Sequence, residues 1–116
     1  MNPHAKLVPG AVAVYGEEVF NQDYPGIVGT DASRVVGCVD GQVVGDFQFI
    51  EAHGHAFHHC MWYHLPTKTV FSGDGMGFGF KEINMCPLLC TSPTQYDSKS
   101  WRLTIKKIEE LNPDYI

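Results

Sequence analysis

Histidines gather in one short stretch of this chain, and the pattern that comes after them constrains how the chain can fold. Five of the six histidines lie between residues 53 and 64. Residues 59–65 have the composition of a strand, Pro66-Thr67-Lys68 is typical of a turn, and residues 69–72 predict a returning strand. In a hairpin, the start of the first strand lies close to the end of the second. The loop that enters the first strand should therefore lie beside Asp74, which follows the second.

This juxtaposition of side chains is typical of a metal centre. Imidazole nitrogen and carboxylate oxygen are both ligands for zinc and iron. Gly73-Asp74 alone would also suit an ordinary turn. Its position next to the histidine run is what favours a functional site.

A second hairpin is expected before the histidines. Asp40-Gly41 is a strong two-residue turn signal, and the β-rich residues 34–39 and 42–50 flank it. Phe47 and Phe49 alternate with polar neighbours, which indicates a half-buried strand.

The remaining segments predict one further strand, two loops and one helix. Residues 11–15 are apolar and predict a short strand, whereas residues 16–33 contain Gly and Pro and predict a loop. Residues 73–95 are also rich in Gly and Pro, and a loop of this length is usually functional or mobile. A helix is expected from a cap at Asp97 or Ser98, with apolar residues at helical spacing, to Asn112-Pro113.

Composition bounds the classes of function. The chain has 116 residues, enough for one domain with one core, and its net charge of −5 argues against a nucleic-acid partner. No apolar run is long enough to cross a membrane, and the first residues do not resemble a signal peptide. Four cysteines form no dense framework, so we expect a reduced, cytoplasmic protein. The spacing of Cys86 and Cys90 is not the usual spacing of a zinc motif.

The order of these segments resembles the second half of the metallo-β-lactamase superfamily. Residues 2–7 look like the strand that follows the first metal-binding helix of that family. The residues that carry the match most specifically are His53-Gly54-His55-Ala56-Phe57-His58-His59, Val70-Phe71-Ser72-Gly73-Asp74, and the segment from Trp101 to Ile116.

The resemblance implies roles for individual side chains. His55 matches the metal-binding histidine of the Gly-His motif, and Asp74 matches the aspartate that bridges two metals. His59 matches a position that supports the loop, while His53 and His58 have no assigned role and could substitute as ligands. The opening signature His-x-His-x-Asp-His is absent, and the sequence stops before the position of the last histidine ligand. The resemblance therefore implies a single truncated domain over residues 1–116.

The expected fold is α/β, a partial αββα sandwich with one mixed or antiparallel sheet and a C-terminal helix. The leading function is hydrolysis of a small ester, lactone or thioester with zinc, or less readily iron or manganese. Alternatives are a non-catalytic binding or assembly module that kept the scaffold and lost the chemistry, and one half of a split enzyme; the chain could also bind no cofactor at all. A half sandwich exposes apolar surface, so a homodimer is expected, and a small-molecule ligand is possible.

Overall fold

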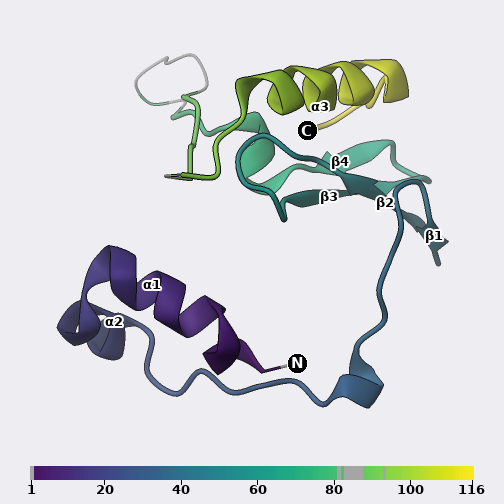
Figure 1. The fold of residues 1–116 in the computed structure, drawn as a ribbon. Helices are drawn as coiled ribbons and strands as arrows, with labels where there is room; N and C mark the ends of the chain where they lie inside the picture. Colours follow the sequence, from purple (N-terminus) through teal and green to yellow (C-terminus); the bar gives the residue numbers. More distant parts are fainter. Residues whose placement is uncertain (1, 81, 83–87, 93) are drawn as a thin grey trace. The chain divides into compact units, whose positions relative to one another are not determined.

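The computed structural model describes residues 2–80, 82, 88–92 and 94–116, and it divides into two compact units. The first unit spans Met1–Gly37 and the second Cys38–Ile116. Both are drawn in Figure 1. None of the described helices combines the length and apolar character that a membrane span requires.

The first unit is helical where strands were expected. Pro3–Ala5 form a short 3₁₀ helix, followed by α1 (Leu7–Tyr15) and α2 (Glu17–Asp23). The predictions of a strand at residues 11–15 and of a strand at residues 2–7 are therefore wrong. The prediction that residues 16–33 form only a loop is also wrong, because α2 lies within them. A short apolar run suits a helix as well as a strand. Here Gly16, with φ of 84°, ends the helix by donating its N–H to the carbonyl of Val12.

The second unit contains one antiparallel sheet in the order β1-β2-β3-β4. Its strands are β1 (Val43–Val44), β2 (Phe47–Glu51), β3 (Cys60–His64) and β4 (Thr69–Phe71). The hairpin expected around residues 66–68 is thereby confirmed. The mixed helix and strand content bears out the α/β class, and the four strands pair antiparallel.

The hairpin expected around Asp40-Gly41 has its turn at a different place, between β1 and β2. Asp40-Gly41 does form a turn, but the residues before it form no strand, so the strand predicted at 34–39 is wrong. The carboxylate of Asp40 instead accepts the backbone N–H of Glu51 at 2.8 Å. The strands β1 and β2 are joined at Gly45, whose φ of 59° suits a tight turn between strands.

Helix α3 (Ser98–Leu111) lies over one face of the sheet (Figure 1). The predicted cap is confirmed, because the carboxylate of Asp97 accepts the N–H of Lys99 at 2.9 Å. The helix ends at Asn112 in the left-handed conformation, as Asn permits. The core beneath the helix is formed by Ile50, Ala52, Met61, Tyr63, Val70 and Ile108. These contacts fix the ends of β2, β3 and β4. The loop of residues 52–59, which we call the histidine loop, and Asp74 extend from these ends.

Candidate metal centre

The loop that carries His55 is clamped against α3. Gly54 has a φ of 134°, and a Cβ at this position would overlap the Cα of Trp101 and lie 2.6 Å from its backbone nitrogen. The carbonyl of Gly54 accepts the N–H of Asp97 at 2.9 Å, and the carbonyl of His53 accepts the hydroxyl of Thr104 at 2.7 Å. Only glycine fits so close to the helix backbone. The Gly-His pair thus places His55 at a fixed point beside the helix.

Asp74 comes from the other end of the hairpin. It lies in the short 3₁₀ helix η3 (Gly73–Met76), which directly follows β4. The carbonyl of Gly75 accepts a buried hydrogen bond of 2.6 Å from the indole N–H of Trp101. Trp101 therefore positions both loops, since it contacts Gly54 on one side and Gly75 on the other.

A third segment brings Cys90 to the same point. Phe78 and Leu88 exchange two backbone hydrogen bonds, of 3.0 and 2.7 Å, which bring the segment containing Cys90 back toward the sheet. Two residues later, Ser92 donates its backbone N–H to the carbonyl of His55 at 3.2 Å. Cys90 thus lies beside His55 although 35 positions separate them in sequence.

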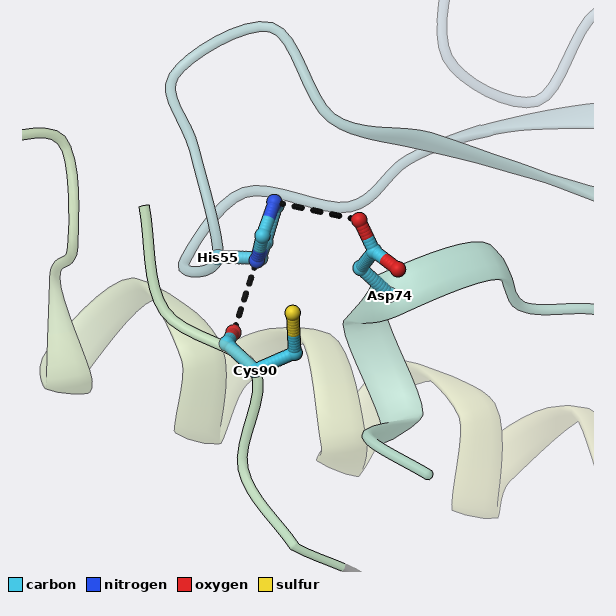
Figure 2. Close-up of side chains that lie close together, drawn as sticks. All are labelled: His55, Asp74 and Cys90. Atoms are coloured by element: carbon cyan, nitrogen blue, oxygen red, sulfur yellow. Dashed lines mark hydrogen bonds and ion pairs between the residues drawn. The ribbon is translucent and has the colours of Figure 1, made fainter. Parts of the chain in front are cut away.

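The three side chains form one compact cluster, shown in Figure 2. One ligand atom each of His55, Asp74 and Cys90 lies within 4.8 Å of the other two. Nε2 of His55 is 3.4 Å from Oδ2 of Asp74. The His55 side chain is 11 % exposed and that of Asp74 is 62 % exposed. The site is therefore closed on the imidazole side and open to solvent at the carboxylate.

The imidazole of His55 is held in one tautomer. Its Nδ1 lies 2.7 Å from the backbone carbonyl of Cys90, which can only accept a hydrogen bond. Nδ1 therefore carries a proton, and in the neutral ring Nε2 presents its lone pair to the cluster. A hydrogen bond of this kind is the usual means by which proteins orient a histidine ligand.

The same lone pair has a second neighbour. The hydroxyl of Ser92 lies 3.2 Å from Nε2 of His55 and can donate a hydrogen bond to it. Both ring nitrogens of His55 are thus satisfied by groups of the chain itself. A metal at this site would have to displace Ser92 from Nε2.

His59 lies next to the cluster but outside it. Its Nδ1 donates to the carbonyl of Ala52 at 3.0 Å, and its ring centroid is 5.4 Å from that of His55. Burial lowers the pKa of His59 below the usual value, although the hydrogen bond to Ala52 opposes this effect. A neutral ring here supports the loop through its hydrogen bond to Ala52.

The remaining candidates point elsewhere. Nε2 of His53 lies 3.6 Å from a carboxylate oxygen of Glu51, and both side chains are about half exposed. His58 is exposed, and neither residue belongs to the three-residue cluster. The structure thus brings together His55 and Asp74, adds Cys90, and leaves His53, His58 and His59 outside the group of possible ligands.

Cys90 is the member of the cluster that sequence reasoning missed. The sequence pattern relates it only to Cys86, which lies outside the described residues. The useful signal is a cysteine in a Gly- and Pro-rich loop that follows a candidate ligand. The spacing of Cys90 from Cys86 carries no information about its proximity to His55.

The donor set itself favours zinc. A neutral imidazole, a carboxylate and a thiolate are all zinc ligands, and three protein ligands leave a fourth position open. The thiolate disfavours hard ions such as magnesium and manganese.

Comparison of the chain with protein-family models, curated proteins and solved structures finds no match. The class of protein is therefore defined by fold and site alone. It is an α/β protein with a candidate metal centre at one end of its sheet.

Proposed function

We propose that this protein binds one zinc ion through Nε2 of His55, the carboxylate of Asp74 and Sγ of Cys90. We further propose that it hydrolyses a small ester, lactone or thioester on a metallo-β-lactamase-like scaffold. The observation that supports this proposal is the convergence of three different donors from three separate segments within 4.8 Å. The hydrogen bond from Nδ1 of His55 to the carbonyl of Cys90 adds to it, because in the neutral ring it leaves Nε2 as the nitrogen that can bind a metal once Ser92 is displaced.

The ligand number suits catalysis better than a purely structural role. Structural zinc sites usually have four protein ligands, whereas catalytic sites have three and an open position. When bound, zinc supplies a nucleophile at neutral pH by lowering the pKa of a coordinated water to about 7. The exposed carboxylate of Asp74 leaves that side of the site accessible to a substrate.

The surrounding residues have defined tasks in this proposal. The carbonyl of Cys90 keeps the proton of His55 on Nδ1, and Trp101 holds the two loops that carry His55 and Asp74. Once a metal displaces the Ser92 hydroxyl from His55, this hydroxyl can accept a hydrogen bond from a group in the open position or donate one to it. Asp74 Oδ2 faces His55, and Figure 2 shows its other carboxylate oxygen pointing away from the imidazole.

A second candidate function is a binding or assembly module without catalysis. The observation that favours it is that both ring nitrogens of His55 already have partners, Cys90 and Ser92. In this role His55 connects the loop of residues 88–92 to the histidine loop. Binding of zinc would then be weak or absent.

Metal analysis of the full chain, purified without a histidine tag, tests the zinc site. We expect about one equivalent of zinc, and less than about a tenth of an equivalent in His55→Ala or Cys90→Ser. Matched controls are His58→Ala and Cys60→Ser, because both residues are exposed and outside the cluster. Cobalt in place of zinc should give a thiolate charge-transfer band that Cys90→Ser removes and Cys60→Ser leaves unchanged. Equal metal content in all five proteins would refute the site.

Turnover separates the two candidate functions. Chromogenic esters, lactones and thioesters are incubated with the chain in the presence and absence of zinc. Zinc-dependent turnover that is lost in His55→Ala supports the hydrolase. Weak or absent zinc binding together with no turnover on any of these substrates supports the binding module, and stoichiometric zinc binding without turnover refutes the hydrolase while keeping the zinc site.

A further inference from the structure

The sheet face opposite α3 carries a contiguous group of apolar side chains. Cross-strand pairing places Val44 opposite Phe47, Phe49 opposite Trp62, and Trp62 opposite Phe71. Residues paired in this way share one face of a sheet. We call Val44, Phe47, Phe49, Trp62 and Phe71 the aromatic face. The alternate residues, among them Ile50, Met61 and Val70, form the core beneath α3.

The rings of the aromatic face are organised as a unit. Trp62 is central, with its ring centroid 5.3 Å from that of Phe49 and 6.4 Å from that of Phe47. Phe47 also contacts Phe71, at a centroid distance of 6.0 Å. Phe47, Val44 and Phe71 are 37 %, 49 % and 56 % exposed. Exposed apolar patches of this kind mark interaction sites.

The shape of this face fits a protein surface better than a small molecule. A hollow of about 520 Å³ lies between Val44, Phe47, Trp62 and Phe71. All four of these residues are apolar, whereas small-molecule sites contain polar groups that fix the orientation of the ligand. The hollow therefore has the volume of a ligand site without its means of recognition.

Pairing of sheet edges does not offer an alternative mode of association. Strand β1 has two residues, and short edge strands are poor templates for edge pairing. At the other edge, β4 is flanked by the C-terminal segment, and Val70 donates its N–H to the carbonyl of Tyr115 at 2.9 Å. Of the edges and the uncovered face of the sheet, the aromatic face is thus the surface that suits a partner.

We infer that the aromatic face is a docking surface for a second copy of this chain. A two-fold axis through the face would set the hollow of each copy against the rings of the other, as a self-complementary interface requires. None of the five residues of the aromatic face is charged, so two chains of net charge −5 can meet there without burying charge at the centre of the interface.

The area is compatible with a reversible dimer. An aromatic side chain removes about 150–250 Å² from water when fully buried, so the exposed parts of the aromatic face amount to roughly 350 Å² per copy. Two copies bury about twice this area, and Glu51, Cys60, His64 and Thr69 on the same sheet face add a polar rim. The total approaches about 1,200 Å², the lower end of specific interfaces. An interface at this lower end is typical of a weak, reversible association.

Sedimentation velocity of the full chain from about 1 to 300 µM tests this inference. We expect a monomer–dimer equilibrium in the wild type and at least a tenfold higher dissociation constant in Phe47→Asp. The matched control is Leu103→Asp, because Leu103 is 68 % exposed on α3 and the change adds the same charge. The control should dimerise as the wild type does. Thermal unfolding verifies that each variant is folded, and Val44→Asp replaces Phe47→Asp if that variant is not.

The outcomes are separable from those of the zinc proposal. A wild type that stays monomeric up to 300 µM overturns the inference. The inference is also overturned if Phe47→Asp, or its replacement Val44→Asp, dimerises as strongly as the Leu103→Asp control. Zinc binding should be the same in all of these proteins, since the aromatic face contains none of the cluster residues. Loss of dimerisation with retained zinc binding therefore supports the docking surface by itself.

Discussion

Gly54 and Trp101 approach each other so closely that residue 54 has no room for a side chain. The backbone of the histidine loop rests directly on the backbone of α3 at this point. Trp101 also donates its indole N–H to Gly75 beside Asp74. One helix residue therefore sets the separation of the two loops that meet at His55 and Asp74.

Replacement of Gly54 by alanine should strongly destabilise the second unit. The added Cβ would overlap Trp101, and φ at residue 54 is unfavourable for any side chain. We expect a loss of about 2–4 kcal/mol in the free energy of unfolding, measured by urea denaturation. Gly37→Ala is the control, because its Cβ would have no neighbour within 4 Å. Similar unfolding of the two variants would show that the clamp is not formed.

Removal of the Ser92 hydroxyl should strengthen metal binding. The oxygen of this hydroxyl lies 3.2 Å from Nε2 of His55, where it can donate a hydrogen bond to the lone pair, so zinc must displace it. A hydrogen bond contributes about 0.5–1.5 kcal/mol, so Ser92→Ala should bind zinc up to about tenfold more tightly by calorimetric titration. Ser92→Thr, which keeps the hydroxyl, should bind as the wild type does. A tenfold weaker affinity in Ser92→Ala would instead identify Ser92 as a ligand.

The elements predicted correctly are those with local signals. The turn at residues 66–68 lies between two segments of strand composition, and helix α3 has both a cap at Asp97 and apolar residues at helical spacing. The proximity of the histidine loop and Asp74 at the open end of the hairpin also results from hairpin geometry alone. This is why the contact of His55 with Asp74 could be anticipated from sequence.

The elements predicted wrongly lack such signals or depend on distant contacts. The run at residues 11–15 fits a helix and a strand equally well by length and composition. The turn at Asp40-Gly41 is recognisable from sequence, but the hydrogen bond that Glu51 donates to Asp40 comes from a residue 11 positions away. Cys90 reaches His55 across 35 positions through a loop without periodicity, so no local pattern could place it.

Asp40 should make stability depend on pH in the acid range. The ammonium of Lys107, which donates to Asp40 at 2.9 Å, is the main cause that lowers the pKa of this carboxyl, and the N–H of Glu51 contributes. The stabilising contribution of Asp40 is therefore fully present above the unfolded pKa of about 3.9. It is lost as pH falls through the lower folded value.

A double-mutant cycle measures this contribution. Because both side chains are partly exposed, we expect about 0.2–1 kcal/mol of coupling between Asp40→Asn and Lys107→Met at pH 7. Urea denaturation at pH 7, 5 and 3 should show the coupling unchanged at pH 5 and reduced at pH 3. A coupling that grows on acidification would contradict the assigned ion pair.

Zinc should protect one thiol selectively from alkylation. Cys38, Cys60 and Cys90 are all free, and Cys60 is exposed, but only Cys90 belongs to the cluster with His55 and Asp74. A coordinated thiolate is a weaker nucleophile toward iodoacetamide than a free one. We expect zinc to slow alkylation of Cys90 at least tenfold, measured peptide by peptide by mass spectrometry, with no change at Cys38 or Cys60. His55→Ala should abolish the protection, because loss of one of three ligands releases the ion. Protection of Cys60 equal to that of Cys90 would show that zinc binds elsewhere, and the assignment of Cys90 as a ligand would then be wrong.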